Sequence, residues 1–176
     1  MIFLLRKGNF PSAFFYLEDN MSVDLQTNYP QQILGDDPQK DEAQKMATDL
    51  QTLLNLFKAL QQNPTDADAQ GFWALICSAV NSINIEYQYL SNGAGPIPQN
   101  EVTKMFGGFN EDVLGYRIAP GTHKTFQFTC VEAESKNYTD LHTFLDSLEN
   151  QPGVFEILIQ ETQKAQQMFK EYADSH

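Results

Sequence analysis

The chain has 176 residues, a formal net charge of −12 and a sequence pI of about 4.4. Nucleic-acid binding depends largely on Lys and Arg side chains that displace counterions from phosphates, so this composition argues against a nucleic-acid partner and against an anionic membrane surface. It favours basic protein partners, because a negative surface speeds their encounter. Hydrophobic residues make up 41% of the chain, which is enough for the core of a single domain over residues 1–176.

The first 20 residues are the most apolar part of the chain. Whether they form a signal peptide or a membrane anchor decides which cellular compartment the sequence predicts. Their apolar run Ile2–Leu5 precedes the basic residues Arg6 and Lys7, which is the reverse of the order in a signal peptide. Charged residues, Gly and Pro also interrupt the run long before the roughly 20 apolar residues of a membrane span. We therefore expect residues 1–20 to be either an N-terminal β-hairpin or a non-native extension upstream of a start at Met21.

Two long helices are predicted within residues 39–91. Apolar residues recur there at spacings of three and four, the pattern of one buried helical face. The first stripe consists of Ala43, Met46, Leu50, Leu53, Phe57 and Leu60, and the second of Phe72, Ile76, Ala79, Ile83 and Leu90. Asn63-Pro64 ends the first helix, and the short connection predicts an antiparallel helical hairpin. A loop over residues 91–98 and a short helix over residues 99–106 are expected to follow.

A β-hairpin is predicted over residues 113–134. Apolar and polar residues alternate in both halves of this segment, as in strands with one buried face. The apolar positions are Tyr116 and Ile118 in the first half, and Phe126, Phe128 and Cys130 in the second. Between them, Ala119-Pro120-Gly121-Thr122 has Pro and Gly at the central positions of a type II turn.

Two more helices are predicted over residues 137–173. Their apolar stripes are Leu141, Phe144, Leu145 and Leu148 in the first, and Phe155, Leu158, Thr162, Ala165, Phe169 and Tyr172 in the second. The sequence thus predicts a mainly helical α+β fold, in which about four helices form a bundle with a packed β-hairpin.

The two cysteines, Cys77 and Cys130, are too few for a disulfide framework, so a reducing, cytoplasmic compartment is the simpler expectation. Both lie among core residues of their predicted elements, where burial makes a thiol unreactive. A catalytic arrangement would need Cys130 beside His142, with Asp146 one helical turn on to orient the imidazole. The His and Cys spacings match no zinc motif, and no metal or cofactor is predicted.

The segment Met105-Phe106-Gly107-Gly108-Phe109 is the strongest candidate for a binding site. It places three large apolar side chains around two glycines, and Glu111 and Asp112 follow directly. An apolar group of side chains rimmed by acidic residues suits a basic or amphipathic protein partner. In the alternative interpretation, Phe106 and Phe109 cap the core of the bundle.

These features predict a small acidic cytoplasmic protein that acts by binding another protein, as an inhibitor, an immunity-type protein or a secretion chaperone. Such roles need a stable scaffold, a negative surface and an apolar patch, and we favour them over catalysis. One alternative is a bacterial secreted effector, in which the Gln-rich C-terminal helix serves as a translocation signal. Another is an enzyme with a hidden Cys/His site.

Overall fold

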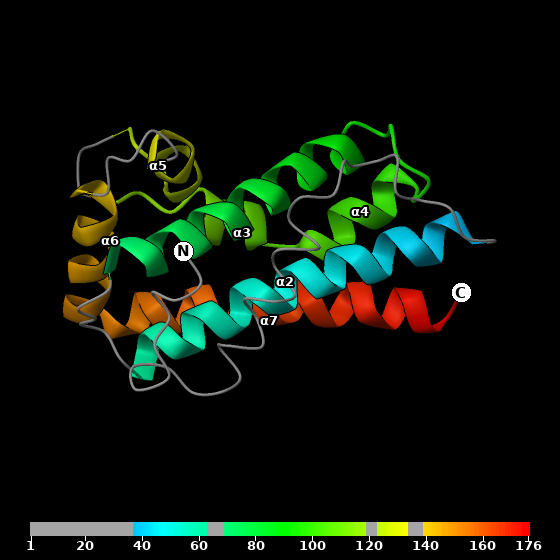
Figure 1. Cartoon of the computed structure of the whole chain (residues 1–176). Coiled ribbons are helices and arrows are strands. Elements are labelled where there is room, and N and C mark those ends of the chain that lie inside the picture. Colours follow the sequence, from blue (N-terminus) through cyan, green and yellow to red (C-terminus); the bar gives the residue numbers. More distant parts are fainter. Residues whose placement is uncertain (1–36, 63–68, 119–122, 134–138) are drawn as a thin grey trace.

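A computed structural model describes residues 37–62, 69–118, 123–133 and 139–176. The two interpretations of residues 1–20 fall outside these ranges. Within them, six α-helices and one π-helical segment account for the regular structure. In chain order these are α2 (Pro38–Gln62), α3 (Ala69–Ser91), α4 (Gln99–Phe106), η2 (Asn110–Leu114), α5 (Phe126–Ala133), α6 (Thr139–Asn150) and α7 (Pro152–Asp174) (Figure 1).

The predicted stripes of the two long helices are confirmed as buried faces of α2 and α3. Every residue of the first stripe and every residue of the second is at most 2% exposed. The two helices run in opposite directions and pack together, and α7 lies along α2 (Figure 1). Thirteen of the 25 residues of α2 are buried, because α2 contacts both neighbours and needs a buried arc wider than one stripe.

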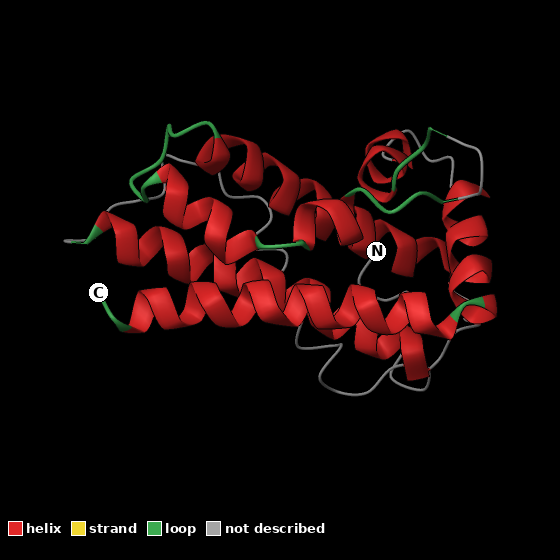
Figure 2. Cartoon of the chain, turned by 180° about the vertical axis from the view of Figure 1, so that it is seen from behind, coloured by secondary structure: helices red, strands yellow, loops and turns green. Residues whose placement is uncertain are grey.

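The predicted β-hairpin over residues 113–134 is wrong. Within the described residues this segment forms η2 and α5 and has no strand, so the fold class is all-α instead of α+β (Figure 2). The buried side chains of α5 are Phe126, Thr129, Cys130 and Ala133, at helical positions i, i+3, i+4 and i+7. Phe128, which a strand would place on the same face as Phe126, is 49% exposed.

A short reversal of the chain remains between η2 and α5. Arg117 and Thr125 form an isolated antiparallel bridge. The Phe126 amide donates to the Tyr116 carbonyl oxygen at 2.7 Å, and the Ile118 amide donates to the Lys124 carbonyl oxygen at 3.2 Å. The predicted turn residues 119–122 lie outside the described residues. The sequence pattern thus found a place where the chain turns back but overestimated the length of the pairing.

Buried aromatic rings join the helices around Phe57 of α2. The Phe57 ring lies 6.0 Å from that of Phe126 in α5 and 6.4 Å from that of Phe155 in α7. Phe126 in turn stacks on Phe144 of α6 with 4.3 Å between ring centroids. These contacts confirm the apolar positions predicted for the two C-terminal helices at Phe144 and Phe155, and they connect four helices through one core.

Gly115 closes the π-helical segment, and alanine should not fit there. The Gly115 amide donates to the Asn110 carbonyl oxygen at 2.8 Å, and a Cβ on Gly115 would lie 2.8 Å from the backbone oxygen of Glu111. Because backbone cannot move aside as a flexible side chain can, we expect Gly115→Ala to lower the free energy of unfolding by about 1–3 kcal/mol. Urea denaturation would measure the change.

Gly153 provides the matched control for this substitution. It lies in the first turn of α7, and a Cβ there would meet no atom within 4 Å. Gly153→Ala should therefore leave the free energy of unfolding unchanged or raise it slightly, since alanine favours a helix over glycine. Equal losses from both alanine variants would show that the contact with the Glu111 carbonyl does not matter.

No helix in the described part of the chain has both the length and the apolar character needed to cross a bilayer.

Candidate functional site

The apolar side chains of the Met105–Phe109 segment lie in the core. Met105, Phe106 and Phe109 are each at most 3% exposed. The Phe106 ring is 4.9 Å from the rings of both Tyr87 in α3 and Phe169 in α7, and 6.0 Å from that of Phe109. This is the arrangement of the alternative interpretation, in which the phenylalanines cap the bundle. An exposed apolar patch formed by these three side chains is not present.

A groove nevertheless runs between this segment and α7. Its volume is about 590 Å³, within the range of small ligand pockets. The residues that line it are Lys104, Met105, Phe106, Gly107, Gly108, Gln160, Glu161, Gln163, Lys164, Gln167 and Met168. We call it the α4–α7 groove. Among its apolar lining residues, Met168 of α7 is partly exposed, whereas Met105 and Phe106 are almost fully buried. Long polar side chains of α7 border the groove.

Two carboxylates meet over Gly108 at this groove. A Cβ on Gly108 would lie 2.5 Å from Oε1 of Glu161 and 2.9 Å from Oδ2 of Asp112, so the missing side chain lets both carboxylates approach the same point. Lys164 pairs with Glu161 at 3.2 Å, and the Glu161 side chain is only 15% exposed. One ammonium thus stands beside two carboxylates, which favours a further cation at this place.

The two acidic residues predicted for the site lie in the first turn of η2. Glu111 and Asp112 are both exposed. The structure therefore brings Asp112 to the α4–α7 groove, beside Glu161, and keeps Glu111 at the neighbouring surface.

The residues of α7 that line the groove were not predicted as part of a binding site. Gln160, Glu161, Lys164, Gln167 and Met168 were not selected, because they lie more than 50 residues from the Met105–Phe109 segment. The available signal was the polar face of α7 opposite its buried stripe, but only the packing of α4 on α7 shows which part of that face borders a groove.

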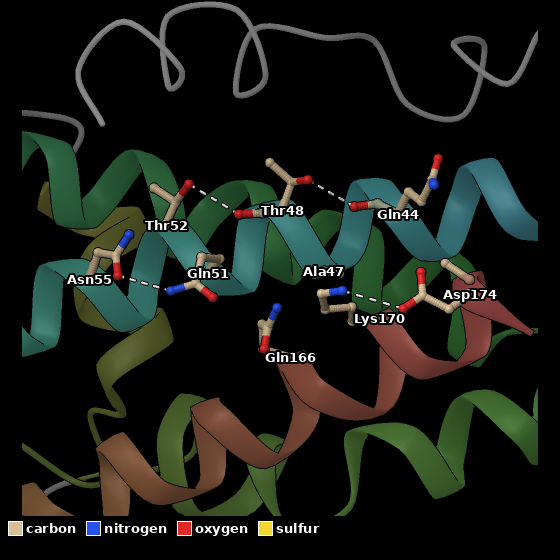
Figure 3. A pocket seen from close by; sticks show the side chains of 10 residues that line it. Gln44, Ala47, Thr48, Gln51, Thr52, Asn55, Gln166, Lys170 and Asp174 are labelled. Atoms are coloured by element: carbon tan, nitrogen blue, oxygen red, sulfur yellow. Dashed lines mark hydrogen bonds and ion pairs between the residues drawn. The ribbon is translucent and has the colours of Figure 1, made fainter. Parts of the chain in front are cut away.

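A second groove, on the other side of α7, is lined mainly by polar side chains of α2 (Figure 3). Its volume is about 560 Å³. The Thr52 hydroxyl donates to the Thr48 carbonyl oxygen at 3.1 Å, and the Gln51 amide donates to Asn55 at 2.9 Å. Lys170 pairs with Asp174 at 3.3 Å. Because these polar groups satisfy one another within their own helices, this groove offers few unpaired groups to a ligand.

Tyr172 holds the C-terminal end of α7 to the start of α2. Its hydroxyl donates to Oε1 of Gln39 at 2.7 Å. Burial raises the pKa of the Tyr172 hydroxyl, and the carboxylates of Glu101 and Asp37 raise it further. The hydroxyl therefore stays protonated and keeps donating over an even wider pH range than an ordinary tyrosine.

Both cysteines are buried, whereas His142, the predicted partner of Cys130, is exposed. Cys130 is fully buried in α5 and Cys77 is 3% exposed in α3. The exposed ring of His142 instead packs edge-on against Trp73, with centroids 6.0 Å apart. Among the residues that the structure describes, no group of three His, Cys, Asp or Glu side chains is placed to hold a metal ion.

The described residues define an all-α protein with a groove on each side of its C-terminal helix. Comparison with known proteins adds no relative: the chain matches no family model, no curated protein sequence and no solved structure.

Proposed function

We propose that this protein acts by binding another protein, and that the α4–α7 groove receives a basic amphipathic segment of that partner. The observation that carries the proposal is a groove that combines the partly exposed side chain of Met168 with the two carboxylates at Gly108. Apolar side chains of the segment would enter the groove, and a Lys or Arg would reach the carboxylates of Asp112 and Glu161.

The charge of the whole chain supports a basic partner. At −12, the protein attracts positively charged molecules from a distance and repels acidic ones. Inhibitors, immunity-type proteins and secretion chaperones all work in this way, by contact alone. The effector and Cys/His enzyme hypotheses have no observation of comparable weight, because the polar face of α7 borders grooves and Cys130 lies in the core.

A site-specific crosslinking experiment in the source cell identifies the partner. A photoreactive amino acid at Gln167, which lines the groove, should capture one predominant protein. The same amino acid at Glu149, which is exposed on α6, should not capture it. Capture of the same protein with equal yield at both positions would place the contact elsewhere.

Binding of the purified partner then tests the carboxylates. We expect Asp112→Asn combined with Glu161→Gln to weaken binding about five- to tenfold at low salt, and to flatten its salt dependence, because two negative charges that face the partner are lost. The control is Asp146→Asn combined with Glu149→Gln, which removes the same charge from exposed positions on α6. Isothermal titration calorimetry gives both affinities, and equal weakening by the two pairs would contradict the groove as the binding site.

A further inference from the structure

Gly108 lies where the carboxylates of two helical segments converge at the α4–α7 groove. A Cβ on this residue would lie so close to Oε1 of Glu161 and to Oδ2 of Asp112 that both oxygens border the volume that a side chain would occupy. Glu161 belongs to α7 and Asp112 to η2. The absence of a side chain at Gly108 thus allows oxygens from two segments that are remote in the sequence to approach one point.

The Glu161 carboxylate uses its two oxygens for different contacts. Oε2 pairs with Nζ of Lys164 at 3.2 Å, one helical turn further along α7, whereas Oε1 is the atom that approaches Gly108. The Glu161 side chain is 15% exposed and that of Lys164 is 63% exposed, so protein largely covers the carboxylate while the ammonium stands at the surface. The ion pair therefore orients the carboxylate and leaves Oε1 beside Oδ2 of Asp112.

Charge alone does not discriminate between basic side chains at this groove. The ammonium groups of Lys104 and Lys164 line the same groove, and both side chains are exposed. They offset the two carboxylates in number, so a ligand gains most from hydrogen bonds directed at the converging oxygens. Lysine carries its charge on a single nitrogen, whereas arginine presents several N–H groups in a rigid plane that matches carboxylate oxygens.

We propose that the α4–α7 groove selects arginine over lysine, and that Gly108 determines this preference. A guanidinium placed over Gly108 would donate to Oε1 of Glu161 and to Oδ2 of Asp112 at the same time, which one ammonium does less well. The inference rests on the function proposed for the groove, and it specifies the side chain by which the partner is recognised.

Gly108→Ala should change the groove without changing the fold. Of the described glycines, Gly93 and Gly107 have a positive φ and Gly108 does not, so alanine suits the backbone there. The atoms that its Cβ would meet are the ends of carboxylate side chains, which can rotate away, unlike the Glu111 carbonyl oxygen at Gly115. The formal net charge stays at −12. The variant therefore separates the position of the carboxylates from their charge.

Two synthetic amphipathic helical peptides test the preference. Both consist of leucine, alanine and one basic residue, which is arginine in the first peptide and lysine in its twin. Fluorescence anisotropy over a range of salt concentrations gives the dissociation constant of each peptide. We expect the unchanged chain to bind the arginine peptide about five- to tenfold more tightly, because a guanidinium makes a second charge-assisted hydrogen bond. In Gly108→Ala this ratio should fall to about twofold or less, with the affinity for the lysine peptide nearly unchanged.

Gly153→Ala is the matched control, because a Cβ there meets no atom within 4 Å and the net charge is again unchanged. It should keep the arginine preference of the unchanged chain. Glu161→Asp is a second test that does not depend on how well alanine is tolerated at Gly108. It keeps the charge but draws the carboxylate back by one methylene, and it should also abolish the preference. Urea denaturation shows that each variant is folded.

Failure of the arginine preference can be told apart from failure of the proposed function. If neither peptide binds the unchanged chain, or if Asp112→Asn combined with Glu161→Gln leaves both affinities unchanged, the proposed function fails and the preference fails with it. If binding depends on these carboxylates but Gly108→Ala and Glu161→Asp keep the ratio of the unchanged chain, only the preference is overturned. An equal loss of the ratio in Gly153→Ala and Gly108→Ala would also overturn it.

Discussion

Replacing Phe126 with alanine is expected to lower the free energy of unfolding by about 3–5 kcal/mol. The Phe126 ring is fully buried, stacks on Phe144 with an interplanar angle of 12°, and contacts Phe57. Its loss would leave a cavity where α5 meets α2 and α6, because the surrounding rings belong to different helices and cannot all move inward. Urea denaturation followed by far-ultraviolet circular dichroism measures the change.

Phe128→Ala is the matched control within the same helix. Phe128 is 49% exposed, so its truncation should change the free energy of unfolding by no more than about 0.5 kcal/mol. Both variants should be measured at the same protein concentration and under the same solvent conditions. A strand would place both rings on one buried face, and similar large losses from the two substitutions would therefore contradict a helical α5.

The long helices could be predicted from the sequence because their patterns repeat over several turns. The stripe in α2 extends from Ala43 to Leu60 and that in α7 from Phe155 to Tyr172, and only a helix keeps so many apolar residues on one side. The short helix over residues 99–106 was also predicted with the bounds that the structure gives it. The proline before it and the glycine after it mark its ends clearly.

The sequence of α5 was wrongly predicted to be a β-strand because this helix is only about two turns long. Phe126, Phe128 and Cys130 fit a strand, while Phe126, Thr129, Cys130 and Ala133 fit a helix, and aromatic residues raise the strand propensity. Over eight residues, the two-residue period of a strand and the 3.6-residue period of a helix match the apolar positions about equally well. Packing decides between them, since a helix buries Phe126 and Cys130 against α3 and α6 and leaves Phe128 outside.

The candidate site was predicted only in part, for a similar reason. Sequence reasoning found the Met105–Phe109 segment and Asp112, because glycines and large apolar residues stand out in a short stretch. It could not predict Glu161 or Lys164 as site residues, because in the sequence they look like any other solvent-facing residues of a helix. Their role depends on the distance between two helices that are remote in the sequence.

Buried carboxylates are a further feature that no pattern revealed. Glu42 and Asp49 of α2 and Glu86 of α3 are fully buried. Asp49 accepts a hydrogen bond from the Ser82 hydroxyl at 3.4 Å. Burial raises the pKa of the Tyr89 hydroxyl, and the carboxylate of Glu42 raises it further, so acidic groups interact here at the α2–α3 contact.

The burial of the Glu86 carboxylate is energetically unfavourable. It lies on the core side of α3, three residues after Ile83, and neither of its side-chain oxygens has a hydrogen-bond partner among the described residues. An isolated carboxylate in the core is unfavourable when ionised, and it loses its hydrogen bonds to water even when protonated.

We therefore expect Glu86→Leu to raise the free energy of unfolding by about 1–3 kcal/mol at pH 7, because leucine fills a similar volume without a polar group. Chemical denaturation of the two proteins under the same conditions measures the gain. The control is Glu149→Leu, at an exposed position of α6, which should stay within about 0.5 kcal/mol of the unchanged chain.

The pH dependence gives this prediction a second, independent measurement. Burial without a hydrogen-bond partner penalises the ionised form of a carboxylate more than the neutral form. A glutamate in the unfolded chain is ionised at pH 7 and largely protonated near pH 4. The gain from Glu86→Leu should accordingly be larger at pH 7 than at pH 4. A loss of stability at pH 7 would mean that the carboxylate of Glu86 makes a favourable interaction in the folded protein, and it would refute this account of the α2–α3 contact.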